Sequence, residues 1–168
     1  MPGAPTVATI RLYLKPAVRK FVAAKLGDLH RAAGDQTALQ LWRILEERMG
    51  VKLLAVKSPM EAGDAPKAYI LVDVLADEER LAYLVNPDRE RSWHREAVNG
   101  CVNQEFYGDM YRWVDWYRSR LHWSTVRSLE QYRRHYSISE EDYPFNSCWR
   151  MYMKHAKRCE MVRPYRRA

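Results

Sequence analysis

Several features that define common protein classes are scarce or missing in this 168-residue sequence. It has only three cysteines, Cys101, Cys148 and Cys159, and none of them belongs to a CxxC pair. Three isolated cysteines predict neither a disulfide framework nor a zinc knuckle, and they are typical of a reducing compartment. No apolar run approaches the ~20 residues that a membrane-spanning helix needs, and the first residues do not resemble a secretory leader. We therefore expect a soluble cytoplasmic protein with no membrane partner.

Signatures of catalysis are also missing. The sequence contains no GxxxxGK[ST], GxGxxG, GxSxG or HExxH. His155 and Cys159 are four residues apart, a helical spacing that brings two metal ligands together, but no second pair stands near them in the sequence. The acidic candidates for a two-metal nuclease are Asp73, Asp77, Glu78, Asp109 and Asp115, and nothing in their spacing distinguishes them from ordinary surface charge. We expect no enzyme activity, no catalytic residue, no metal and no cofactor.

Positive charge, in contrast, is abundant and unevenly distributed. The formal net charge is +7 and the sequence pI is about 9.4. Residues 1–58 carry a net charge of +6, residues 59–109 carry −6, and residues 110–168 carry +7. The last segment has 13 basic residues against 6 acidic ones, with Trp and Tyr interleaved. Basic side chains neutralise phosphates and aromatic rings stack on bases, so this composition favours a nucleic-acid partner.

The first half of the sequence predicts both strands and helices. Residues 7–15 alternate between apolar and polar, as a half-buried strand does, and Pro16 is a suitable first residue of a helix. A second helix is expected after Thr37 as its cap, and Gly50 closes it. Residues 51–56 predict a short strand. Residues 67–75 alternate with apolar side chains on both faces, which indicates a central strand.

A strand followed by two helices permits two interpretations. In a ribbon-helix-helix protein, the strand pairs with that of a second chain and enters the major groove, and Arg11 and Tyr13 would be the reading side chains. Alternatively, the strand belongs to a small mixed sheet within one chain. Arg11 and Tyr13 are therefore secondary candidates for binding.

The last third predicts two helices. Ser124 can cap a helix that extends to about Tyr136, with Val126, Leu129 and Tyr132 inward. A polar turn follows, in which Ser139 and Asp142 resemble a capping box. Because proline is disfavoured inside a helix, the next helix is expected to begin at Pro144. Its apolar positions are Phe145, Trp149, Tyr152 and Ala156.

The basic residues of these two helices are the principal binding candidates. They can form a helix-turn-helix-like DNA-binding unit with a basic outer stripe, or a helical hairpin whose charges are simply solvated. Either way we expect an α+β protein, mainly helical with a small N-terminal sheet. Residues 1–109 would form the α+β domain and residues 110–168 the basic helical region, packed together as one compact unit. The candidates for phosphate contact are Arg127, Arg133, Arg134, Arg150, Lys154, Lys157 and Arg158.

Three stretches of the chain carry a resemblance. IRLYLKPAVRKFVAAKLG, LVNPDRERSWHREAVNGCVNQEFYGDMYRWVD and LEQYRRHYSISEEDYPFNSCWRMYMKHAKR resemble segments of small, uncharacterised basic proteins of bacterial prophages and integrated mobile elements. The resemblance implies a mobile-element context and a helix-turn-helix-like tail, in a DNA-binding regulator or accessory factor. This sequence departs from the pattern of those proteins in carrying Pro144 and Cys148 at the start of its last helix. The competing class is a non-catalytic protein-interaction module, such as a phage inhibitor or assembly factor, and a homodimer remains open.

Two further features have alternative interpretations. Cys148 lies near a helix start, where the pKa of a thiol can fall, yet small buried cysteines are more common. The aromatic residues between 107 and 123 can form a base-stacking platform, although such clusters more often belong to a core.

Overall fold

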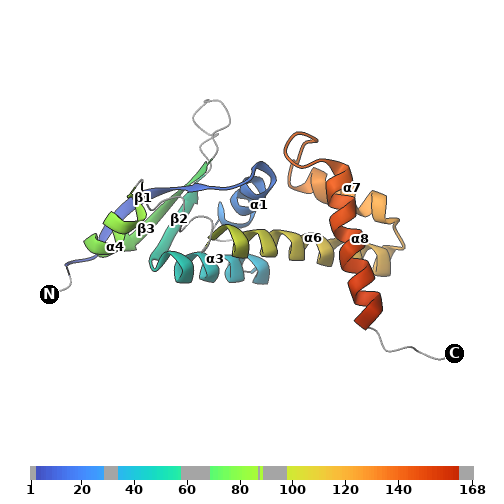
Figure 1. The fold of residues 1–168 in the computed structure, drawn as a ribbon, viewed down its shortest axis with the longest axis horizontal. Coiled ribbons are helices and arrows are strands. Elements are labelled where there is room, and N and C mark those ends of the chain that lie inside the picture. The colour runs from blue at the N-terminus through green and yellow to red at the C-terminus, as the bar shows by residue number, and fades with distance from the viewer. Residues whose placement is uncertain (1–2, 29–33, 58–68, 87, 89–97, 163–168) are drawn as a thin grey trace. The chain divides into compact units, whose positions relative to one another are not determined.

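The computed structural model describes residues 3–28, 34–57, 69–86, 88 and 98–162. Within them the chain has an α+β fold with six helices and one three-stranded antiparallel sheet, as the sequence predicts (Figure 1). The chain divides into two compact units, Met1–Glu105 and Phe106–Ala168, and the predicted boundary lay at 109/110. No helix among the described residues is both long enough and apolar enough to cross a membrane.

The sheet of the first unit contains β1 (Thr6–Tyr13), β2 (Lys52–Lys57) and β3 (Tyr69–Ala76) in the order β1-β3-β2. The strand β3 is central, as its two apolar faces predict, and it pairs antiparallel with both neighbours. Because β1 pairs with β3 of the same chain, the ribbon-helix-helix interpretation is wrong. The strand is an ordinary member of a small sheet, which is antiparallel rather than mixed.

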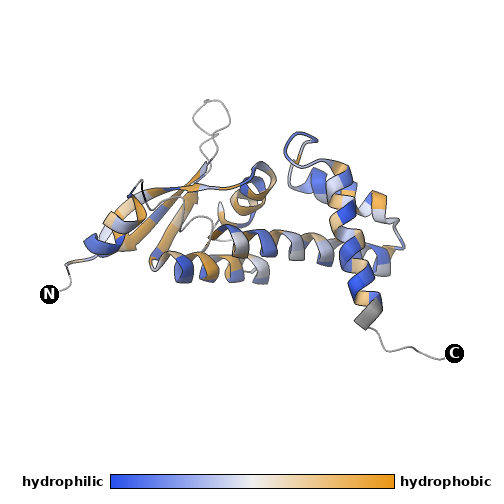
Figure 2. Cartoon of the chain, in the orientation of Figure 1, coloured by the Kyte–Doolittle hydropathy of each residue, from blue (hydrophilic) through white to orange (hydrophobic). Residues whose placement is uncertain are grey.

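One face of this sheet forms the core of the first unit. Rows of paired residues such as Ile10–Val72–Val56 are buried, and the side chains between them point to the opposite face. A bulge between Leu53 and Ala55 keeps this alternation in register along β2. Figure 2 shows that most residues of the three strands are hydrophobic.

Two helices cross from β1 to β2 and contact the sheet. The helix α1 (Pro16–Leu26) begins at its proline, as predicted, and α3 (Gln36–Met49) ends at Gly50 in the left-handed conformation, with φ 65°. The cap of α3, however, is Asp35 and not Thr37, because the Asp35 carboxylate accepts from the backbone N–H groups of residues 37 and 38. Since β1 and β2 run parallel on either side of β3, the arrangement is a split βαβ unit.

The Asp35 carboxylate also ties the two crossover helices together. Lys25 Nζ lies 2.7 Å from Asp35 Oδ2. Burial raises the pKa of Asp35, but the hydrogen bonds from Lys25 and from the two backbone N–H groups outweigh that effect and lower the pKa overall. The carboxylate is therefore ionised at neutral pH.

Two more helices follow β3 along the chain. The short helix α4 (Glu78–Leu84) is capped by Asp77, and the long helix α6 (Gly100–Leu121) follows. Asn86 lies at the edge of the described residues, where its Oδ1 accepts from the backbone N–H of Asp88 at 2.9 Å.

The second unit contains most of α6, from Phe106 onward, together with α7 (Thr125–His135) and α8 (Phe145–Val162). Ser124 caps α7, as predicted, by accepting from the backbone N–H of Arg127 at 3.2 Å. The helix α8 begins directly after Pro144, as the disfavoured interior proline predicts. The residues after α6 and α7 include two left-handed positions without glycine, His122 (φ 55°) and Ser137 (φ 53°).

The inward faces of α7 and α8 differ in part from the prediction. Val126 is 45% exposed, and Ser128 is buried in its place. Ser128 can be buried because its hydroxyl donates to the Ser124 carbonyl at 2.9 Å. On α8, Trp149 is 40% exposed, and Cys148 is buried in its place. In both helices the prediction placed the larger side chain in the core, Val126 rather than Ser128 and Trp149 rather than Cys148.

A buried polar cluster joins α6 to the end of α7. Asp109 is 9% exposed, and its Oδ2 accepts from the Tyr136 hydroxyl at 2.9 Å. The neighbouring Tyr132 is fully buried, and its pKa is raised well above the usual value by burial and then by the Asp109 charge. The Tyr132 hydroxyl therefore keeps its proton near a carboxylate.

Candidate nucleic-acid interface

The principal basic surface of the second unit is the outward face of α8. The inward side of this helix is fixed by Cys148 and Tyr152, which are each 1% exposed. At 100° per residue, the predicted cations then fall on the opposite side and form a stripe about 100° wide. All four are exposed, and no acidic residue lies between the first and the last of them. We call these residues the α8 stripe: Arg150, Lys154, Lys157 and Arg158.

Two large apolar side chains border the α8 stripe. Trp149 and Met153 are 40% and 41% exposed, respectively, on the same helix. Exposed large apolar groups next to cations are more typical of a contact surface than of a purely solvated face. Figure 2 shows both hydrophilic and hydrophobic positions along α8.

The predicted candidates on α7 do not behave alike. Arg127 is exposed, and its guanidinium carbon lies 4.0 Å from the ring centroid of Trp123. Arg134 is exposed as well, and Glu130 lies between these two arginines on the same outward face. The outward face of α7 is therefore less positive than the α8 stripe.

Arg133 has a structural position instead. Its side chain is 14% exposed, lies over the ring of Phe145, and forms a 2.7 Å ion pair with Glu140. Glu140 also accepts from the backbone N–H of Phe145 at 3.0 Å, so it caps α8. The bond from Phe145 and then that from Arg133 lower the pKa of Glu140. Arg133 thus holds the start of α8 through Glu140.

The connection between α7 and α8 spans residues 136–144. This is longer than the turn of about 3–4 residues in a helix-turn-helix. The Ser139–Asp142 pair forms the reciprocal hydrogen bonds of a capping box, with Ser139 N and Oγ donating to Asp142 Oδ2 and Asp142 N donating to Ser139 Oγ. No helix begins there, so the pair stabilises the turn.

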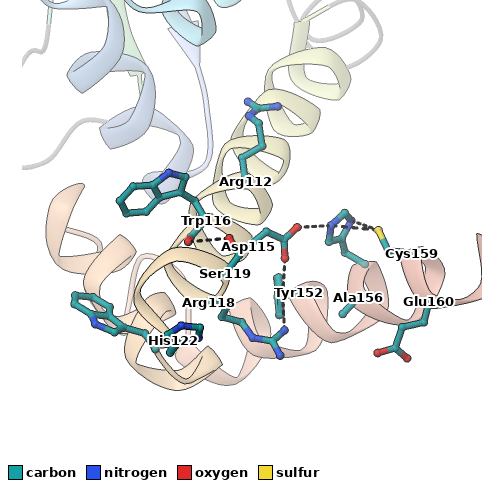
Figure 3. A pocket seen from close by; sticks show the side chains of 12 residues that line it. Arg112, Asp115, Trp116, Arg118, Ser119, His122, Tyr152, Ala156, Cys159 and Glu160 are labelled. Carbon is teal, nitrogen blue, oxygen red and sulfur yellow. Dashed lines mark hydrogen bonds and ion pairs between the residues drawn. The ribbon is translucent and has the colours of Figure 1, made fainter. Parts of the chain in front are cut away.

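A groove on the other side of α8 was not predicted from the sequence. It has a volume of about 850 Å³ and lies between α6 and α8 (Figure 3). At its centre the Tyr152 hydroxyl donates to Asp115 Oδ1 at 2.6 Å and accepts from Arg118 at 2.9 Å. Burial and then the bond to Asp115 raise the pKa of Tyr152. Its lining also includes Arg112, Trp116, His122, Trp123, His155 and Cys159.

The predicted His155–Cys159 pair lies in this groove. Cys159 Sγ is 3.6 Å from His155 Nε2, and Asp115 Oδ2 is 3.4 Å from the same nitrogen. Cys159 Sγ is also 3.9 Å from His155 Nδ1, so both ring nitrogens lie near the thiol. Among the described residues, no group of three or more His, Cys, Asp or Glu side chains can hold a metal ion. The Tyr111 ring stacks on His155 at 4.2 Å.

The remaining candidates have clear positions. Cys148 is a small core residue, and burial raises the pKa of its thiol to about 12, so the alternative of a lowered pKa is wrong. The aromatic residues of α6 are mostly half-buried, and Trp116 is 53% exposed, so the cluster is only partly core. Arg11 and Tyr13 lie in the first unit, on the exposed face of the sheet.

The spacing of basic residues located the α8 stripe, but it could not locate the groove. The groove residues come from two helices about 40 positions apart, and their contacts depend on tertiary packing. No family model matches this chain, and neither the curated proteins nor the solved structures contain a match to it.

Proposed function

We propose that this protein binds duplex DNA through the α8 stripe, as a regulator or accessory factor of a prophage or integrated mobile element. The observation that carries the proposal is the stripe itself, which presents four exposed cations on one helical face without an intervening acid. The major groove of B-DNA admits an α-helix, and each cation that neutralises a phosphate adds a favourable contribution to the binding free energy through counterion release. The mobile-element context rests on the sequence resemblance.

Other cations of the second unit have different roles in the proposal. Arg127 and Arg134 are exposed and can add phosphate contacts, whereas Arg133 maintains the start of α8 through Glu140. Arg118 is engaged with the Tyr152 hydroxyl in the groove. The proposed contact surface is therefore narrower than the 13 basic residues of the last segment.

The experiment that tests the proposal is a salt titration of duplex binding. Fluorescence anisotropy of a labelled duplex should give a log–log slope between about −3.5, for the four cations of the α8 stripe, and about −5.5, with Arg127 and Arg134 added, since each neutralised phosphate contributes ~0.9. The double variant Lys154→Ala/Lys157→Ala should reduce the magnitude of the slope by about 2. The matched control is Arg43→Ala/Arg48→Ala, which removes two exposed cations from α3 and should leave the slope unchanged.

A second candidate function is supported by the exposed Trp149 and Met153. These side chains, next to the α8 stripe, also suit contact with an acidic protein surface, as in a phage inhibitor or assembly factor. The same titration separates the two functions. If the full chain shows no duplex binding at low salt, the DNA proposal fails and the interaction module is favoured.

A further inference from the structure

The sheet of the first unit has an exposed face that combines tyrosines and cations. This face lies opposite the buried rows of the sheet, and its residues alternate with them along each strand. Arg11 is exposed, Tyr13 is 37% exposed, and the Lys57 side chain is 59% exposed. Tyr69 is half-buried beside them. We call these four residues the tyrosine–arginine face.

The register places the two tyrosines side by side. Tyr13 on β1 pairs directly with Tyr69 on β3, and their ring centroids are 5.5 Å apart at an interplanar angle of 67°. The Arg11 guanidinium lies 5.0 Å from the Tyr69 ring centroid. Such a cluster presents aromatic surface and a planar cation together, which are the groups on which unpaired bases stack.

The next row of the same face carries a basic residue on each outer strand of the sheet. Arg11 and Lys57 both pair with Leu71, from opposite neighbouring strands, so their backbones are about 10 Å apart. Asp73, one row further on, accepts from Lys57 Nζ at 2.6 Å and from the Thr9 hydroxyl at 2.7 Å. These two bonds lower the pKa of Asp73, and the charge of the ionised carboxylate is balanced by Lys57. Arg11 has no such carboxylate directly opposite it on β3.

We propose that the tyrosine–arginine face binds single-stranded nucleic acid. Unpaired bases stack on Tyr13 and Tyr69, and Arg11 contacts the phosphates. A duplex does not suit this face, because paired bases are already stacked on one another and cannot lie on tyrosine rings. A second copy of the chain suits it poorly as well. A twofold axis near Arg11 would bring this guanidinium against its own copy, and like charges would repel.

This site is separate from the α8 stripe, since the two belong to different units of the chain. The further proposal therefore does not depend on the proposed duplex binding. Each surface can be altered while the other is kept, so the failure of one proposal is distinguishable from the failure of the other.

The test measures the binding of labelled oligo(dT), oligo(U) and duplex DNA to the full chain and its variants. Tyr69→Leu keeps an apolar side chain but removes the aromatic face, and Tyr69→Phe keeps the ring. Tyr69→Leu should weaken single-strand binding about tenfold, whereas Tyr69→Phe should stay within about twofold of the parent. Arg11→Gln should also weaken it, and Arg43→Gln on α3 is the charge-matched control. Comparing oligo(dT) with oligo(U) distinguishes DNA from RNA.

Duplex binding supplies the second readout. The Tyr69 and Arg11 variants should bind duplex as the parent does, whereas Lys154→Ala/Lys157→Ala should bind single strands as the parent does. Unchanged thermal unfolding of the Tyr69 variants shows that the fold is intact. If Tyr69→Leu is folded and binds single strands within twofold of the parent, the proposal is overturned. Sedimentation of a parental dimer that Arg11→Gln or Tyr69→Leu dissociates would also overturn it, in favour of a subunit interface.

Discussion

The buried contact between Tyr136 and Asp109 should contribute measurably to the stability of the second unit. Tyr136→Phe removes the hydroxyl that donates to Asp109 Oδ2 at 2.9 Å and leaves the ring in place. Both residues are at least nine-tenths buried, so water does not readily replace the lost donor. A hydrogen bond to a charged group is worth roughly 1.5–3 kcal/mol. Asp109 still interacts with Tyr132, so we expect a loss of about 2 kcal/mol.

Urea unfolding followed by tryptophan fluorescence measures this loss, because all but one of the six tryptophans lie at or after residue 93. In a thermal experiment, a loss of this size lowers the Tm by roughly 8–16 °C for a unit of this length. Tyr117→Phe is the control, since the half-buried Tyr117 hydroxyl forms no hydrogen bond within the described part of the chain. A Tyr136→Phe variant within about 0.5 kcal/mol of the parent, or no less stable than Tyr117→Phe, would refute the reasoning.

Two further predictions concern titratable groups. Asp35 has a lowered pKa in the folded chain, so its stabilising effect is complete above the unfolded value near 3.8 and is lost as the pH falls through the folded pKa. Asp35→Asn keeps a good capping residue, so it should cost only a few tenths of a kcal/mol at pH 7 and should flatten the decline in unfolding free energy below about pH 4; a decline as steep as the parent's would contradict the assignment. Burial raises the pKa of Cys148 to about 12, whereas Cys159 is exposed. A thiol reagent at pH 8 should therefore modify Cys159 rapidly and Cys148 only after unfolding, and Cys159→Ser should abolish the fast phase; native Cys148 reacting as fast as Cys159 would count against its burial.

The elements of the fold could be predicted where a local rule acts alone. Strict alternation identified β1 and β3, and the proline and glycine positions gave the starts of α1 and α8 and the end of α3. The cap of α3 was missed because Asp35 and Thr37 are both good capping residues two positions apart. Only the backbone path decides between them.

The inward faces of α7 and α8 were harder to predict for a different reason. A helix buries the side that tertiary packing selects, and one step along the sequence rotates that side by 100°. The prediction followed apolar size and selected Val126 and Trp149, whereas the structure buries Ser128 and Cys148. A serine is buried without an unsatisfied hydroxyl when it donates to the preceding turn, and composition alone does not reveal that bond.

The candidate site divides in the same way. The α8 stripe follows from spacing within one helix, so the sequence could place its four cations together. The ion pair that withdraws Arg133 from the surface depends on the loop that brings Glu140 back to α8, and the tyrosine–arginine face depends on the register of β1 against β3. Neither can be read from local pattern.

The left-handed residue at the end of α6 has a consequence for engineering. His122 adopts φ 55°, a conformation that costs an ordinary residue about 1 kcal/mol and costs glycine little. Its imidazole, however, is part of the lining of the groove. A glycine at this position would relax the backbone and at the same time remove a ring from the groove wall. Attempts to make the protein more heat-resistant should therefore begin at Ser137, the other left-handed position, whose side chain is outside that lining.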